Sequence, residues 1–378
     1  MNKKIATCLA ASMVLSFGST AFAAQTASDE TGEIEALKAR LTKLEGKESR
    51  LEKKADAAKA QKEEEFQFSG DYRFRYLDKH EGDTATSHRW RLAMDKKISD
   101  NIAFNARFFV MDNAEFGNTV AKTYDSTKDT NRADMKLSNA SVTMKNVLGN
   151  PNDELTVGRF GQGFLSTGYW ASEGSFGGLD GAKFSTTIDK GEVTAGFGNW
   201  GGAVKSSSSI KLEEMYYMSA SYPIAKETTL YGMYLKETEG STNPADFDVR
   251  GIGFKTKLTK DFRLYGDYTK NIAKSDGEGM YVSLRYKQAK DNVPKSYEIR
   301  ADYRNVQVNN TYTPLISAAN IDLAELKGFA ISGHYVFAKN ARVELYQQIG
   351  TKYANNGTGY KKGDDAPEYT RLQLVYKM

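Results

Sequence analysis

Residues 66–76, FQFSGDYRFRY, alternate between apolar and hydrophilic side chains. One face of an extended strand would carry the aromatic set, Phe66, Phe68, Tyr72, Phe74 and Tyr76. The opposite face would carry the polar set, Gln67, Ser69, Asp71, Arg73 and Arg75. Successive side chains of a strand point to opposite faces, and a membrane barrel needs lipid on one face and water on the other. The stretch therefore predicts a transmembrane β-strand whose arginines face inward.

The same period of two recurs across residues 66–378 and predicts about sixteen strands, which would enclose an aqueous channel. Long connectors fall at 77–88, 113–132, 161–179, 200–210, 238–246, 308–323 and 353–367. Short connectors fall between them, at 99–101, 189–190, 224–226 and 338–340. Outer-membrane barrels have long outer loops and short periplasmic turns. We therefore predict an all-β antiparallel transmembrane barrel in which residues 161–179 form the third outer loop.

Two of the expected strands do not follow the alternation. Met215–Tyr222 and Leu230–Leu235 are apolar at successive positions. The pattern alone therefore does not say which of their side chains face the channel.

Residues 1–23 have the features of a secretory signal peptide. Lys3 and Lys4 precede an apolar run, and Ala21-Phe22-Ala23 forms a small-residue cleavage site. The one cysteine, Cys8, lies inside this segment, so the mature chain is expected to contain no thiol. No run of eighteen apolar residues follows, which excludes a helical membrane protein.

Residues 24–65 are predicted to form a helical stalk. Its apolar residues recur in steps of three and four, at Ile34, Leu37, Leu41, Leu44 and Leu51. This heptad spacing is typical of a coiled coil, and the heptad stretch would give a rod of roughly 50 Å at the α-helical rise. A single solvated helix or a disordered linker is the alternative, but a lone helix would leave this leucine seam in water.

Several classes of function are excluded or weakly supported. Removing two lysines with the signal lowers the net charge from +4 to +2, too little for the concentrated basic surface of a nucleic-acid binder. The three histidines, His80, His88 and His334, are scattered, so we expect no metal site, no cofactor and no catalytic residue. Ser332 lies two residues from His334, but no acid is identifiable to orient a nucleophilic pair.

Residues 66–378 resemble the general trimeric porins of Gram-negative outer membranes. The resemblance is most specific at 137–144, LSNASVTM, and at 155–160, LTVGRF, followed by the Gly178–Asn199 hairpin. It implies a homotrimer, a third loop folded into the pore, and an arginine cluster that faces acids of this loop.

The stalk is similar to that of porins from diderm Firmicutes. Many of those carry a surface-layer-homology domain before the coiled coil, and residues 24–32 are too few for one. Attachment to the cell wall through such a domain is therefore not expected. The resemblance implies an outer-membrane location, and an even number of strands leaves both termini, and with them the stalk, in the periplasm. Leu372, Leu374 and Tyr376 alternate as in a terminal strand recognised by the barrel-assembly machinery, although the chain ends in Met378 rather than Phe or Trp.

The candidate pore residues are the charged side chains expected on the inner face and at the third loop. The basic ones are Arg73, Arg75, Arg89, Arg91, Arg107, Arg159 and Lys183, and the acidic ones are Glu173 and Asp180. Opposed charges across a bore create a transverse field, and charged rings set the ion preference of a channel. Alternatively, each arginine is simply a solvated residue of the lumen.

These observations lead to three hypotheses of function. The first is a passive diffusion channel for ions and small hydrophilic solutes, constricted by residues 161–179. The second is a structural tether, in which the stalk holds the outer-membrane lipid bilayer to peptidoglycan or an inner partner. The third is a substrate-specific channel, for which the sequence offers no evident sugar or phosphate path.

Overall fold

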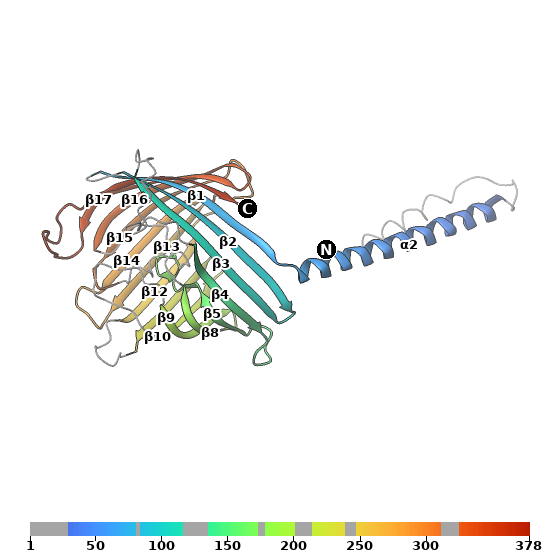
Figure 1. Cartoon of the computed structure of the whole chain (residues 1–378), viewed down its shortest axis with the longest axis horizontal. Coiled ribbons are helices and arrows are strands. Elements are labelled where there is room, and N and C mark those ends of the chain that lie inside the picture. The colour runs from blue at the N-terminus through green and yellow to red at the C-terminus, as the bar shows by residue number, and fades with distance from the viewer. Residues whose placement is uncertain are drawn as a thin grey trace, which may run out of the picture. The chain divides into compact units, whose positions relative to one another are not determined.

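A computed structural model describes residues 29–80, 84–115, 135–172, 178–200, 214–238, 247–310 and 325–378. The chain divides into two compact units, Met1–Glu63 and Glu64–Met378. The first contains most of a single long helix, and the second is a β-barrel (Figure 1).

The helix α2 spans Asp29–Glu64, 36 residues. Four leucines of the predicted seam, Leu37, Leu41, Leu44 and Leu51, are between 58% and 67% exposed on the single chain. Ile34 lies outside the side chains that the structure describes. Within the described ranges, no helix is both long enough and apolar enough to cross a membrane. The helix is therefore present, and its assembly into a coiled coil stays a prediction.

Sixteen strands form one closed antiparallel barrel, so the predicted architecture of residues 66–378 is confirmed (Figure 1). In chain order they are β1 (Gln67–Lys79), β2 (Ala85–Ser99), β3 (Ile102–Glu115), β4 (Met135–Lys145), β5 (Glu154–Phe160), β8 (Leu179–Ile188), β9 (Gly191–Trp200), β10 (Glu214–Ala225), β11 (Thr228–Glu237), β12 (Asp248–Lys257), β13 (Phe262–Asn271), β14 (Glu278–Lys287), β15 (Tyr297–Val306), β16 (Leu326–Ala338), β17 (Ala341–Tyr353) and β18 (Tyr369–Lys377). Each strand pairs with the next, and β18 pairs with β1 to close the ring.

One predicted connector is shorter than expected. The sequence suggested a long loop at 77–88, but β1 continues to Lys79 and β2 begins at Ala85. The ladder extends because Leu77 pairs with Ala85, beyond the last strictly alternating residue, Tyr76. The polar residues near this rim therefore belong to strands rather than to a loop.

The alternation of β1 has the predicted directions. Asp71, Arg73 and Arg75 are at most 9% exposed, whereas Phe68 and Tyr72 on the other face are 63% and 37% exposed. Two strands whose orientation the sequence left open are now assigned. On β10 and β11, Met215, Tyr217, Met233 and Leu235 face inward and are buried, and the intervening side chains face outward.

Candidate functional site

The connector between β5 and β8 folds into the barrel as a compact hairpin. Two short strands, β6 (Gln162–Gly163) and β7 (Ala171–Ser172), pair with each other and not with the barrel. The Phe164 amide donates to the Trp170 carbonyl at 3.0 Å, which closes the hairpin. Phe164 and Trp170 are 2% and 0% exposed, so the tip is enclosed by the rest of the barrel. We call residues 161–172 the inner loop.

The inner loop packs against an apolar patch on the barrel wall. Phe164 meets Tyr217 of β10 edge to face with ring centroids 5.2 Å apart, and Tyr169 stacks on Tyr281 of β14 at 5.4 Å. The loop and wall residues of one buried cluster are Phe160, Phe164, Leu165, Tyr169, Trp170, Leu179, Met215, Tyr217, Met233, Leu235, Phe247, Val249, Tyr281 and Val306. The apolar inner faces of β10 and β11 are therefore explained, because the loop shields them from the channel water.

Polar contacts fix the inner loop at one wall residue, Asp267 of β13. Its carboxylate accepts from the Ser166 amide at 3.1 Å, the Ser166 hydroxyl at 2.7 Å and the Thr167 amide at 2.9 Å. The Thr167 hydroxyl donates to the same carboxylate. Beside it, Trp170 Nε1 donates to Thr269 Oγ1 at 3.1 Å. Since Asp267 is 4% exposed, these four hydrogen bonds take the place of the water that its carboxylate would otherwise bind.

Gly251 of β12 lets the inner loop approach the wall closely. A Cβ atom at this position would lie 2.7 Å from the Met233 side chain, 2.8 Å from Thr269 and 3.1 Å from Leu165. Any larger residue would therefore push against both the wall and the loop.

The wall opposite the inner loop is basic. Counting around the closed ring, β11 lies eight positions from β1, half of the circumference. The inward side chains of β1, β2 and β18 include five arginines, Arg73, Arg75, Arg89, Arg91 and Arg371, which we call the arginine cluster. All but Arg91 are at most 9% exposed. The bore is thus bounded by the inner loop on one side and the arginine cluster on the other.

Within the arginine cluster, few groups neutralise the charge. Asp71 accepts from Arg89 at 3.1 Å and from Arg91 Nε at 2.6 Å. Arg75 Nε donates to the neutral Gln373 amide oxygen at 3.0 Å. Arg73 Nε is buried and has no hydrogen-bond partner among the described residues.

Three arginines of β13, β15 and β17 are instead paired with acids, while Arg304 of β15 donates to the Tyr346 hydroxyl at 2.8 Å. Arg263 lies 2.7 Å from Glu298, and Arg300 contacts the same carboxylate. Arg342 lies 2.5 Å from Glu344.

The connector between β14 and β15 supplies a further acid, Asp291, which pairs with Arg342 at 2.7 Å and with Lys377 at 2.5 Å. Burial alone would raise the pKa of Asp291, but hydrogen bonds from Lys377 and Arg342 outweigh it and hold the pKa below its usual range. This part of the wall therefore presents balanced charge.

Two further predicted pore residues lie on the inner face, away from the arginine cluster. Arg107 of β3 donates to Ser138 Oγ and Asn139 Oδ1 of β4, both at 3.1 Å. Lys183 of β8 places its ammonium 5.2 Å from the ring centre of Phe160, at the start of the inner loop. Glu173, the acid predicted to oppose these arginines, lies outside the described residues.

Arg159 and Asp180 occupy a different place from the one expected. They pair directly across β5 and β8, with two hydrogen bonds of 2.6 Å. Their chain neighbours Phe160 and Leu179 are buried with the inner loop, so Arg159 and Asp180 point to the opposite, outward face. The expectation that these two residues line the pore is therefore corrected. The Gly-Arg step directly precedes the loop and so suggested that Arg159 faces the pore. Because successive side chains of a strand point to opposite faces and Phe160 points inward, Arg159 points outward.

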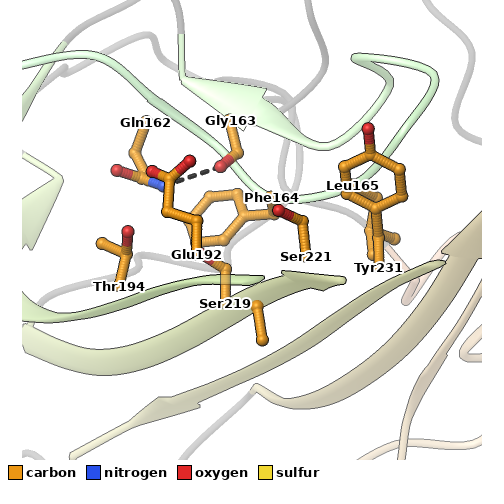
Figure 2. Close-up of a pocket in the computed structure, with 10 residues that line it drawn as sticks. Gln162, Gly163, Phe164, Leu165, Glu192, Thr194, Ser219, Ser221 and Tyr231 are labelled. Atoms are coloured by element: carbon orange, nitrogen blue, oxygen red, sulfur yellow. Dashed lines mark hydrogen bonds between the residues drawn. The ribbon is translucent and has the colours of Figure 1, made fainter. Parts of the chain in front are cut away.

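A cavity of about 230 Å³ lies between the inner loop and the wall of β9 to β11. The loop contributes Gln162, Gly163, Phe164 and Leu165, and the wall contributes Glu192, Thr194, Ser219, Ser221 and Tyr231. Figure 2 shows the Gln162 amide donating to the Gly163 carbonyl, at 2.6 Å, above the wall side chains. Glu192 is the one charged residue in this lining, and hydroxyls supply most of the remaining polar groups. Polar solutes and water can therefore occupy the space beside the loop.

Sequence reasoning missed three residues of this arrangement. Arg371 could have been found, because Leu372, Leu374 and Tyr376 were assigned outward and Arg371 belongs to the other face. Trp170 and Asp267 gave no such signal, since the hydrogen bonds of Trp170 with Thr269 and of Asp267 with Ser166 each join segments about one hundred residues apart in the sequence. Among the described residues, no group of three or more His, Cys, Asp or Glu side chains could hold a metal ion.

Comparisons with known proteins agree with the architecture. No protein-family model matches the sequence, and no curated protein is similar to it. Several solved variants of the porin from Rhodopseudomonas blastica share the fold. A five-substitution variant has 14% identity and a TM-score of 0.52, over 83% of this chain and 100% of that one. A two-substitution variant and a triple mutant have 15% identity with the same TM-score and coverage. The chain thus has the fold of a porin-type outer-membrane barrel.

Proposed function

We propose that this chain forms a water-filled channel in the outer membrane, through which ions and small hydrophilic solutes diffuse passively. The observation that carries the proposal is the inner loop, which lies inside a closed sixteen-stranded barrel and packs on one wall. The opposite wall is hydrophilic and rich in arginine. Barrels of this strand number enclose an aqueous path, and a loop inside narrows it without closing it.

Conductance in planar bilayers tests this proposal. The purified chain, reconstituted in potassium chloride, is expected to give discrete steps whose size is proportional to salt concentration. If circular dichroism shows that the barrel is folded and no conductance steps occur at any protein concentration, the channel proposal is contradicted. Sugars of increasing size, tested by liposome swelling, would then define the largest solute that passes.

A homotrimer is the favoured assembly in this proposal. Outward tyrosines occur on the wall from β10 round to β1, at Tyr72, Tyr216, Tyr222, Tyr268, Tyr335 and Tyr376. By contrast β3, β4, β5, β8 and β9 contain no tyrosine, and their one tryptophan, Trp200, ends β9. Aromatic belts form where a barrel meets the membrane interface. β2 and β12 also lack tyrosine, but β2 has an outward tryptophan, Trp90, and β12 lies between strands with tyrosine. The five adjacent strands β3, β4, β5, β8 and β9 therefore fit a face that is covered by neighbouring copies.

Spin labels test which face meets lipid. Val157 of β5 and Leu284 of β14 both face outward, with 44% and 38% exposure on the single chain. A label on Val157→Cys should be shielded from a lipid-dissolved relaxant, and one on Leu284→Cys should be accessible. Equal accessibility would contradict this interface, while a trimer also predicts conductance steps in threes.

A structural tether is the second candidate function, and the exposed leucine seam of α2 favours it. In this proposal residues 1–23 are a signal peptide, 24–65 a periplasmic stalk and 66–378 the channel. Three helices would bury their seams together, and the stalk would contact peptidoglycan or an inner partner. The terminal strand β18 would be recognised by the barrel-assembly machinery. Deleting residues 33–65 should weaken envelope attachment; unchanged attachment and spacing would contradict the tether while leaving the channel proposal intact.

A further inference from the structure

We infer that the arginine cluster is a binding site for a solute that carries a dianionic phosphate group. The inference deepens the proposed function, since it names a class of solute that would pause on the channel wall. It rests on the pairing of Arg73 with a second arginine and on the lack of a hydrogen bond to Arg73 among the described residues.

The first observation is an unusual strand pairing. Arg73 of β1 lies directly opposite Arg89 of β2 in the antiparallel ladder. Like charges directly opposite each other destabilise a sheet, because their Cβ atoms are only about 4.5–5.5 Å apart. The charged groups that act most strongly on Arg73 are all arginines, namely Arg75, Arg89, Arg91 and Arg371. The fold therefore concentrates positive charge at a point where it costs stability.

The second observation is that Arg73 has no protein partner. It is 6% exposed, and no hydrogen bond to it occurs among the described residues. Its Nε is enclosed, whereas its two terminal nitrogens are not among the enclosed atoms without a partner. A buried guanidinium normally meets an acceptor, since leaving a charged donor unsatisfied is costly. The terminal nitrogens therefore present unused donors to a ligand.

The charge balance selects the ligand. Two acids among the described residues act on the arginine cluster, Asp71 beside Arg89 and Arg91 and Glu344 beside Arg75 and Arg371, so the five arginines outnumber these acids. On the neighbouring wall, Arg263, Arg300 and Arg342 each contact a glutamate, and Arg304 donates to the Tyr346 hydroxyl, so each of these four has a protein partner. A phosphate monoester brings up to two negative charges and three terminal oxygens, which suits several guanidinium forks at once. A carboxylate brings one charge and two oxygens, and so neutralises less of the cluster.

Titration calorimetry on the detergent-solubilised full chain tests the site directly. Inorganic phosphate and glycerol phosphate are the probes, and acetate is the single-charge comparison. We expect saturable binding of both phosphates and at least tenfold weaker binding of acetate. Glycerol phosphate binding alone would assign the site to esters, and binding of both would assign it to the phosphate group. Equal binding of acetate, or no saturable phosphate binding, would overturn the inference.

Variants locate the site. Arg73→Gln should weaken phosphate binding about tenfold, and Arg73→Lys, which keeps the charge and loses the fork, should weaken it less. Arg107→Gln removes the same charge from the same face of the barrel, where Ser138 and Asn139 already hold the side chain, and should leave phosphate affinity within twofold. Equal losses in Arg73→Gln and Arg107→Gln would indicate general electrostatics and overturn the site.

Conductance separates this inference from the proposed function. If both hold, phosphate reduces the chloride current of the wild-type channel along the same saturation curve as in calorimetry. Chloride steps without saturable phosphate binding would refute the site and leave the channel standing. Phosphate binding without any chloride steps would refute the channel and leave the site standing.

Discussion

The two facing walls of the bore obey the same strand geometry but carry opposite chemistry. The inward side chains of β1, β2 and β18 include five arginines, whereas those of β10, β11 and β14 include Met215, Leu235 and Tyr281. The difference lies in what these side chains contact. The apolar wall packs against the inner loop, whereas the arginines of the other wall lie close to one another. An inner face of a membrane barrel is therefore apolar where another part of the chain packs on it.

The comparison also explains why a strand can be apolar on both faces. On β10, outward Tyr216 and Met218 are exposed, while inward Met215 and Tyr217 are buried under the loop. The pattern loses its period of two because neither face meets water. A strand of a barrel sequence that is apolar on both faces thus indicates where an inward-folded loop packs against the wall.

Of the substitutions considered, replacing Trp170 should have the largest effect on the two walls, because its fully buried ring packs the inner loop against the apolar wall. Removing a buried aromatic side chain costs about 3–5 kcal/mol. Trp170→Ala is expected to free the loop and raise single-channel conductance and current noise in planar bilayers. Trp90→Ala is the matched control, since the outward ring of Trp90 is 44% exposed. Identical conductance in the two variants would refute the role of the ring.

Asp267→Ala should have the next largest effect. The change removes the acceptor for Ser166 and Thr167, and hydrogen bonds to charged groups contribute roughly 1.5–3 kcal/mol each. Channel water can satisfy part of the loss, so we expect loop fluctuations rather than full release. Asp267→Asn, which keeps one carbonyl oxygen, should be intermediate. The measurement is low-frequency current noise, and a quiet Asp267→Ala channel would show that packing alone holds the loop.

Asp71→Asn tests the basic wall with a smaller expected effect. Asp71 is the carboxylate that binds Arg89 and Arg91, so its loss raises the net charge of the arginine cluster by one. Anion permeability relative to cation permeability should rise two- to fivefold, corresponding to roughly 0.5–1 kcal/mol for such a pair. Reversal potentials in a salt gradient measure it. Asp100→Asn, in an exposed turn, should cause no shift, and a shift equal to that of Asp71→Asn would show that position in the bore is irrelevant.

Arg159→Ala should leave ion selectivity unchanged. The side chain points outward and is paired with Asp180, with 34% and 39% of the two side chains exposed. A partly exposed ion pair contributes about 0–1 kcal/mol, so a small loss of stability is the expected result. Reversal potentials and denaturant unfolding provide the measurements. A clear change in selectivity would return Arg159 to the pore.

Much of the barrel could be predicted from local chemistry, because strand parity is a local property. The alternation at 66–76 identified the inward arginines of β1, and connector lengths identified the loop at 161–179. The prediction that Arg159 lines the pore was wrong because it was based on the Gly-Arg step before the loop. Arg159 directly precedes the inward Phe160, and neighbouring side chains of a strand point to opposite faces. The contact of Ser166 with Asp267 could not be foreseen, since one hundred residues separate them and the closure of the ring brings them together.

The apolar inner face of β10 and β11 also has a consequence for how the barrel forms. In a newly synthesised chain, β10 and β11 have apolar side chains on both faces. The polarity of these two strands therefore does not determine which face will become the inside of the barrel. Once the inner loop docks, the two faces differ, because Thr167 and Trp170 of the loop donate hydrogen bonds to Asp267 and Thr269 on the inner face. Docking of the loop should therefore accompany closure of the ring rather than follow it, and a barrel deprived of its loop would assemble slowly or with these strands in the wrong register.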